Sequence, residues 1–118
     1  MRKSSNPTGA AAEEFALQFL KRQQLQLIER NFNTRFGELD LIMQDQDSLV
    51  FVEVRYRRSS LFGSSIESVT HSKQHKLKLT AQTFLSQLNA HATACRFDIV
   101  ALQGDLRDPL VDWIKNAF

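Results

Sequence analysis

The chain has 118 residues, of which 42% are hydrophobic and 24% are charged, and its formal net charge is +2. This length suits one small domain, so we expect a single domain over residues 1–118. No apolar run is long enough to span a bilayer, and the basic amino terminus continues into polar residues instead of an apolar signal segment. A cytoplasmic protein with no membrane partner is therefore expected. The lone cysteine, Cys95, excludes an intramolecular disulfide and a multi-cysteine zinc site.

The first predicted element is a helix. Residues 1–5 read as a loose polar tail, and the Asn-Pro-Thr sequence at 6–8 is typical of a helix start. From residue 9 to about residue 23 the apolar side chains recur at helical spacing. Glu13 lies beside this apolar stripe, and two interpretations are open. Either it points towards a sheet, or it is a first-turn glutamate that the helix dipole favours.

A strand predicted over residues 25–32 leads into a β-hairpin over residues 36–58, with a polar turn at 45–48. Side chains alternate between the faces of a strand, so Glu38 and Asp40 share one face of the first hairpin strand. Glu53 and Arg55 likewise share one face of the second. A turn centred between residues 46 and 47 places Asp40 opposite Glu53, and Glu38 opposite Arg55. The other face of the first hairpin strand then holds Leu39, Leu41 and Met43.

Opposed carboxylates on a half-buried sheet repel each other unless a cation lies between them. Magnesium takes oxygen ligands and often uses one or two carboxylates together with a substrate phosphate. We therefore expect Asp40 and Glu53 to hold Mg²⁺ or Mn²⁺, with Arg55 on the same face to meet a phosphate. The alternative is a solvated sheet face on which Glu38 and Arg55 form a cross-strand ion pair.

The second half of the chain opens with a Ser-rich segment at residues 59–65, which is either a flap near a substrate or a plain connector. An amphipathic helix follows, from a cap at Thr70 or Ser72 to about Asn89. Its predicted apolar face comprises Leu77, Ala81, Phe84, Leu85 and Leu88.

The start of this second helix is cationic. Lys73 and Lys76 oppose the helix dipole there, which indicates that one of them has another use. His71 and His75 have the spacing of a zinc pair on a helix, but no third ligand follows them.

Two more strands are predicted, over residues 96–102 and 110–114, and the second is a short edge strand on which Trp113 packs. The order αβββα followed by strands predicts an α+β (α/β) fold with a mixed central sheet flanked by helices. An exposed edge near Trp113 could pair with a partner or with a second copy, so a homodimer is one expectation.

Several short motifs recur in a fixed order along the chain. They are Gly9 with Glu13 and Ala16, Arg30-Asn31-Phe32, the block from Gly37 to Ile42, the block from Val50 to Val54, Arg57, Phe62-Gly63, Val69 with Lys73, Arg96-Phe97-Asp98, and residues 113–118. Together they resemble the YraN-type family of small bacterial proteins, over nearly the whole chain. The resemblance implies a restriction-endonuclease-like αβββαβ core.

The resemblance also implies the PD-(D/E)XK nuclease pattern, in which an aspartate is followed after a variable gap by Glu-x-Lys. On this chain the pattern falls on Asp40 and on Glu53-Val54-Arg55. Asp40, Glu53 and the Val54 carbonyl would then hold the metal. Glu13 would match the helical acidic residue of the archaeal Holliday-junction resolvase branch of this fold, and Lys73 would match a basic position near the site.

One departure from the pattern is Arg55, which stands where the pattern usually has lysine. A lysine whose pKa is lowered can lose its proton and help to activate water, whereas an arginine effectively cannot. Arg55 can still stabilise charge on a phosphate, and water activation would then fall to the metal.

Three functions are carried forward as hypotheses. The first is a magnesium-dependent DNA endonuclease, acting on DNA that is branched or otherwise structured. The second is a nucleic-acid-binding module of the same fold that does not cleave, and the third is a protein-interaction domain. For the endonuclease, the metal site is Asp40, Glu53 and Val54, the catalytic set adds Arg55 and Glu13, and the residues expected to hold the DNA backbone are Arg57, Arg58, Lys73 and Lys76.

Overall fold

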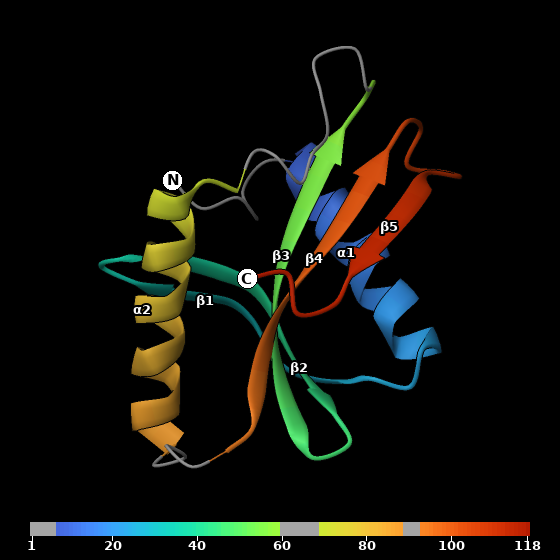
Figure 1. Ribbon diagram of the computed structural model, residues 1–118. Helices are drawn as coiled ribbons and strands as arrows, with labels where there is room; N and C mark the ends of the chain where they lie inside the picture. The colour runs from blue at the N-terminus through green and yellow to red at the C-terminus, as the bar shows by residue number, and fades with distance from the viewer. Residues whose placement is uncertain (1–6, 60–68, 89–92) are drawn as a thin grey trace.

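The structure is a computed structural model that describes residues 7–59, 69–88 and 93–118. These ranges contain two helices and five strands (Figure 1). The predicted polar tail, the helix cap at residue 6 and nearly all of the Ser-rich segment lie outside the described residues. In chain order the elements are α1 (Pro7–Arg22), β1 (Gln26–Thr34), β2 (Gly37–Asp45), β3 (Ser48–Arg57), α2 (His71–Leu88), β4 (Cys95–Gln103) and β5 (Leu110–Ile114).

The strands form one mixed sheet in the order β1-β2-β3-β4-β5. Strands β3 and β4 are parallel, and every other neighbouring pair is antiparallel. Parallel neighbours need a long crossover connection, and α2 supplies it between β3 and β4. The predicted mixed sheet flanked by helices is confirmed, and the element order is consistent with a restriction-endonuclease-like core.

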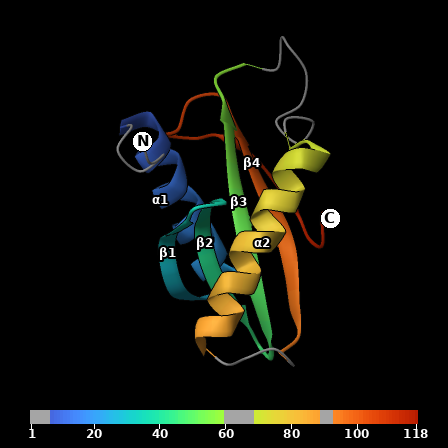
Figure 2. The ribbon, with the colours of Figure 1, turned by 90° about the vertical axis from the view of Figure 1, so that its left-hand side faces the viewer.

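A helix covers each face of the sheet, with α1 on one side and α2 on the other (Figures 1 and 2). Strands buried on both faces read as nearly continuous apolar runs, which explains the sequences of β2 and β3. On the α1 side the helix packs Ala12, Ala16, Leu17 and Leu20 against Leu41, Met43, Val50, Val52, Val54, Val100 and Leu102. On the α2 side Leu77, Ala81 and Phe84 pack against Phe32, Leu39, Ile42, Phe51 and Ile99.

The predicted register of the β2–β3 hairpin is confirmed from Leu41 to Asp45, but the predicted pairs of Asp40 with Glu53 and of Glu38 with Arg55 are not among the backbone pairs of these two strands. Its pairs run from Leu41 with Val52 to Asp45 with Ser48, around a turn at Gln46 and Asp47. The turn lacks the Asn-Gly or Asp-Gly that usually favours a left-handed backbone. Gln46 takes that conformation instead, with φ of 54°. Burial of both strand faces holds this register, because a slip by one residue would exchange the two faces.

Helix α2 begins at His71, and of its two predicted caps the structure uses Thr70. The Thr70 hydroxyl oxygen accepts a hydrogen bond from the backbone N–H of Lys73 at 3.2 Å. Four of the five predicted apolar positions pack against the sheet. The expectation for Leu88 was wrong, because at the last residue of the helix its side chain is 53% exposed.

Strand β5 is an edge strand, as predicted, and Trp113 packs its ring edge-on against Phe19 of α1 at 6.0 Å between centroids. Leu110 at the start of this strand is 71% exposed. Neither described helix has the length and apolar content needed to cross a membrane.

Asp98 on β4 is fully buried and joins β4 to the residues that follow β5. Its carboxylate accepts hydrogen bonds from Arg96 Nε at 3.0 Å, Trp113 Nε1 at 2.9 Å and the backbone N–H of Asn116 at 2.9 Å. Burial alone lowers the pKa of the Arg96 guanidinium, but hydrogen bonds to Asp98 and Asp45 outweigh burial and raise that pKa. The motif Arg96-Phe97-Asp98 therefore has a structural role.

We expect Asp98→Ala to lower the free energy of unfolding by about 3–5 kcal/mol, because the N–H groups of Arg96 Nε, Trp113 and Asn116 lose their buried acceptor, and Arg96 keeps only its pair with Asp45. Urea denaturation followed by Trp113 fluorescence measures this loss. The control is Asp105→Ala, which removes an exposed ion pair with Arg107 and an exposed hydrogen bond from its backbone N–H, and should change the midpoint far less. Equal stability of the two variants would contradict the structural role of Asp98.

Candidate metal and nucleic-acid site

Asp40 and Glu53 are buried carboxylates on neighbouring strands of the sheet, with side-chain exposures of 0% and 3%. Asp40 Oδ2 accepts a hydrogen bond from the backbone N–H of Val54 at 2.8 Å. This nitrogen belongs to the peptide bond that joins Val54 to Glu53, so the Asp40 carboxylate lies beside the backbone of the predicted Glu-x-Arg motif. The alternative interpretation, charges on a solvated sheet face, is wrong for these two acids.

Glu53 lies between two cations. Its Oε2 is 2.9 Å from Arg55 Nη2 and 3.7 Å from Lys73 Nζ. Arg55 follows two residues later on the same face of β3, as the alternation predicted, and its side chain is only 16% exposed. Lys73 comes from the first turn of α2, which covers that face. The contact with Glu53 accounts for a lysine at a helix start, where the dipole disfavours it.

The strict alternation predicted along the first hairpin strand is wrong at Asp40. Leu39 packs on the α2 side of the sheet, whereas Leu41 packs on the α1 side, although both were expected on one face. The partner strand shows the cause. The pairs Arg30 with Leu41 and Phe32 with Leu39 bracket Asn31, whose φ of 50° is left-handed.

A left-handed residue inside a strand turns the chain locally, so the two strands change faces together where Asn31 lies across from Asp40. The last recorded pair between β2 and β3, Leu41 with Val52, also lies here. Past that pair, the Asp40 carboxylate receives the Val54 N–H. The irregularity therefore places Asp40 at the point where β2 and β3 stop pairing.

Glu13 of α1 is 1% exposed, and its Oε1 accepts a hydrogen bond from Asn31 Nδ2 at 2.9 Å. Glu13 thus contacts the residue that lies across from Asp40. Helix α1 has no acidic residue in its first turn, so the dipole interpretation of Glu13 is wrong. Its neighbour Glu14 is exposed instead, and hydrogen bonds from Gln18 and Arg30 lower the pKa of the Glu14 carboxyl.

Asn31 is the site residue that the sequence interpretation missed. It appeared only within the motif Arg30-Asn31-Phe32, with no role assigned. Asparagine inside a strand-like run was the available signal, because asparagine tolerates a left-handed backbone better than most residues and disfavours regular strands.

The remaining predicted cations fall into two places. Lys76 lies on α2, near Gly37 of the β1–β2 turn. Arg57 is the last residue of β3, and Arg58 follows it; the Arg57 carbonyl oxygen accepts a hydrogen bond from the Gly104 N–H at 3.0 Å.

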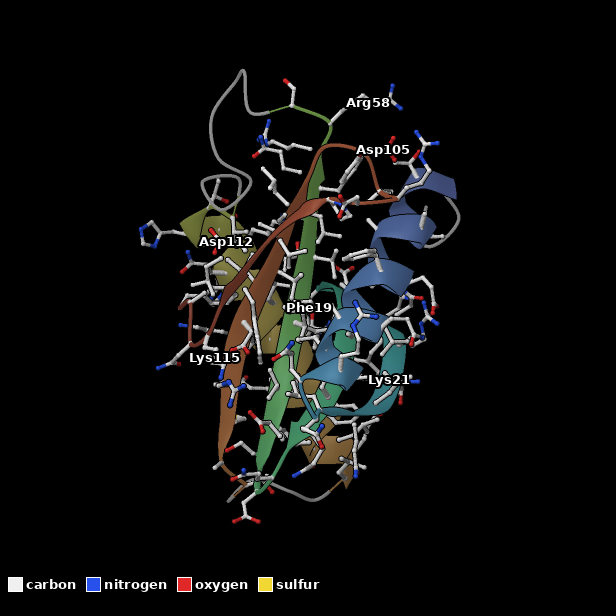
Figure 3. The ribbon with its side chains drawn as sticks, turned by 90° about the vertical axis from the view of Figure 1, so that its right-hand side faces the viewer. Phe19, Lys21, Arg58, Asp105, Asp112 and Lys115 are labelled. Atoms are coloured by element: carbon white, nitrogen blue, oxygen red, sulfur yellow. The ribbon has the colours of Figure 1, made fainter. Side chains whose placement is uncertain are left out.

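Arg58 is exposed and lines a pocket of about 550 Å³ at the start of α1. Asp105 lines the same pocket, and Figure 3 shows both residues at that end of the molecule. The carboxylate of Asp105 offsets part of the Arg58 charge. In this pocket a phosphate would therefore meet a cation whose charge is already partly balanced.

The donor atoms around Asp40 and Glu53 suit magnesium, which prefers carboxylate and carbonyl oxygens. Within the described ranges, no three His, Cys, Asp or Glu side chains are arranged to hold a metal ion. Glu13 therefore does not complete a three-acid cage, and a zinc site at the exposed His71 and His75 has no third ligand among the described residues. Two carboxylates with a backbone carbonyl remain a suitable set for an ion that keeps several waters.

Comparison with known proteins gives a consistent result. The profile of the Uncharacterised protein family UPF0102 matches residues 12–102. A UPF0102 protein of Colwellia psychrerythraea is 50% identical over 117 residues, which cover 98% of this chain and 91% of that protein. UPF0102 proteins of Pseudomonas syringae pv. syringae and Nitrosomonas eutropha are 50% and 45% identical, and the matches cover 97% and 96% of their lengths. The chain therefore belongs to the UPF0102 family, the YraN-type family that its motifs resemble.

Proposed function

We propose that this protein is a magnesium-dependent DNA endonuclease that hydrolyses phosphodiester bonds. The observation that carries the proposal is the buried pair Asp40 and Glu53 on neighbouring strands, with Arg55 and Lys73 at 2.9 Å and 3.7 Å from Glu53. Removing a carboxylate from water costs several kcal/mol, so buried acids at one place need a compensating role. A cation that also receives a phosphate supplies such a role.

Each residue has a distinct part in the proposed reaction. Asp40, Glu53 and the Val54 carbonyl would hold magnesium, which polarises the phosphate and lowers the pKa of water when it is bound. Arg55 carries a planar guanidinium that suits two phosphate oxygens, and it stabilises the charge that develops there. Glu13, fixed by Asn31, orients the attacking water. The water oxygen bonds to phosphorus and releases a proton to solvent, the bond to the leaving oxygen breaks, and that oxygen takes up a proton from solvent to leave as an alcohol.

A second candidate is a nucleic-acid-binding module that does not cleave. The ion pair between Arg55 and Glu53 favours it, because the guanidinium already balances the charge of that carboxylate at 2.9 Å. Arginine at position 55 also removes the lysine that could activate water. The module would bind DNA through Lys73 and Lys76 and would leave it intact with any metal.

Titration calorimetry with MgCl₂ tests the metal site. We expect Asp40→Asn to weaken magnesium binding at least about tenfold, because the charge is lost while an oxygen remains to accept the Val54 N–H. Asp47→Asn is the matched control, since Asp47 is exposed in the turn of the same hairpin. Equal affinity of Asp40→Asn and the wild type would exclude Asp40 as a ligand.

Incubation with branched, nicked and single-stranded DNA in Mg²⁺ or Mn²⁺ tests cleavage. We expect the wild type to cut at least one substrate, and Glu53→Gln to reduce the rate by at least about a hundredfold. Glu14→Gln is the control, because Glu14 is an exposed glutamate that pairs with Arg30. Cleavage that persists unchanged in both Glu53→Gln and Asp40→Asn would end the endonuclease proposal. DNA binding without any cleavage would favour the second candidate.

The salt dependence of DNA binding tests the cationic side of α2. We expect the affinity to fall steeply with salt, and Lys76→Ala to reduce the slope of log affinity against log salt by about one. Arg22→Ala, an exposed arginine at the end of α1, should leave this slope unchanged. Fluorescence anisotropy over a series of NaCl concentrations measures these slopes, and a salt-independent affinity would contradict both candidates.

A further inference from the structure

The turn between β1 and β2 presents an arginine stacked on an aromatic ring. We call residues 34–37 the tip. The Arg35 guanidinium carbon lies 4.9 Å from the centroid of the Phe36 ring. Arg35 is exposed and Phe36 is partly exposed, so a flat cation and a flat ring are together accessible from solvent. Planar surfaces of this kind are those on which nucleic-acid bases stack.

The tip is held firmly against α2. The hydroxyl oxygens of Thr34 and Thr80 lie 3.2 Å apart, and the backbone N–H of Phe36 donates to Thr34 Oγ1 at 3.1 Å. Thr80 is fully buried. A methyl group added at Gly37 would lie 3.8 Å from Thr80 Oγ1 and 4.0 Å from the Cβ atom of Lys76. Figures 1 and 2 show the turn beside α2. The stacked pair thus stands on a rigid base.

One face of α2 connects the tip to the acids. Lys73, Lys76 and Thr80 are spaced i, i+3 and i+7, so they lie along one side of the helix. Lys73 is 3.7 Å from Glu53 at one end of this stripe, and Thr80 contacts the tip at the other. A strand of DNA that passes Lys73 and Lys76 on its way from the acids therefore reaches Arg35 and Phe36.

We propose that the tip stacks against an unpaired base of DNA and directs the protein to DNA in which a single strand adjoins a duplex. This inference rests on the proposed function, because it deepens the substrate class of that site. Bases within a duplex already stack on their neighbours, whereas an unpaired base has a free face for Phe36 and Arg35. Each base stacked on an aromatic side chain raises affinity roughly tenfold, without regard to sequence.

The spacing between the tip and the acids predicts how far the scissile phosphate lies from the stacked base. Phe36 lies in the turn just before β2, four residues from Asp40, which corresponds to about 13 Å at about 3.3 Å per extended residue. A stacked DNA strand advances about 3.4 Å per nucleotide. The proposal therefore places the scissile phosphate about four nucleotides from the stacked base.

Two labelled DNAs of equal length and charge test the inference: a fork with unpaired arms and a fully paired duplex. Anisotropy in the absence of metal gives both affinities. We expect the wild type to bind the fork about tenfold more tightly than the duplex. Phe36→Tyr should keep this preference, whereas Phe36→Leu, which keeps an apolar side chain but no ring, should lose it. Arg35→Ala should reduce it, and the control Arg22→Ala should leave both affinities unchanged.

A second readout reports the stacking itself. With 2-aminopurine in the unpaired arm, fluorescence should be quenched on binding to the wild type and to Phe36→Tyr, and not on binding to Phe36→Leu. Unfolding midpoints verify that each variant is folded. A wild type without fork preference, or a Phe36→Leu variant that retains preference and quenching, overturns the inference.

The two proposals fail separately. A fork preference that depends on Phe36, without cleavage in Mg²⁺ or Mn²⁺, sustains the tip and refutes the endonuclease. Cleavage that is identical on fork and duplex and unaffected by Phe36→Leu overturns the tip, and the endonuclease proposal stands.

Discussion

A single hydrogen bond organises the centre of this molecule, from Val54 N–H of β3 to the carboxylate of Asp40 on β2, over 2.8 Å. It forms where the backbone pairing of β2 with β3 ends. The Asp40 side chain there accepts the Val54 N–H, which a backbone carbonyl of β2 would accept in a regular ladder. Hydrogen bonds to a charged acceptor contribute about 1.5–3 kcal/mol, more than neutral ones. Because both faces of the sheet are covered by helices, the bond lies in a dry region where it is stronger than in water.

The buried acids of this chain divide into two kinds. Asp98 accepts hydrogen bonds from Arg96 of β4, Trp113 of β5 and Asn116, and the last two join β4 to β5 and to the residues after it. The partners of Asp40, Glu53 and Glu13 described above come instead from three elements, namely β1, β3 and α2. Two cations, Arg55 and Lys73, form ion pairs with Glu53. Asp98 therefore has a structural role, whereas the surroundings of the other three acids fit the proposed metal site.

Much of this arrangement was predictable from sequence, because it follows from periodicity. The helical faces, the hairpin register and the shared face of Glu53 and Arg55 all derive from repeats of 3.6 or 2 residues. The change of faces between Leu39 and Leu41 could not be predicted from sequence, because it depends on the left-handed backbone of Asn31 on another strand. A contact such as Glu13 with Asn31 joins residues far apart in the chain, and no local pattern encodes it.

The hydrogen bonds accepted by Asp98 also affect how the chain folds during synthesis. The strands β1, β2 and β3 are joined by short turns and can pair as soon as they leave the ribosome, because their contacts are local. Strand β4 must wait for α2, since it pairs in parallel with β3. Even then the Asp98 carboxylate lacks one hydrogen-bond donor until the backbone N–H of Asn116 has been synthesised. A nascent chain arrested before these residues would therefore hold a buried carboxylate that keeps Arg96 and Trp113 but lacks one of its donors.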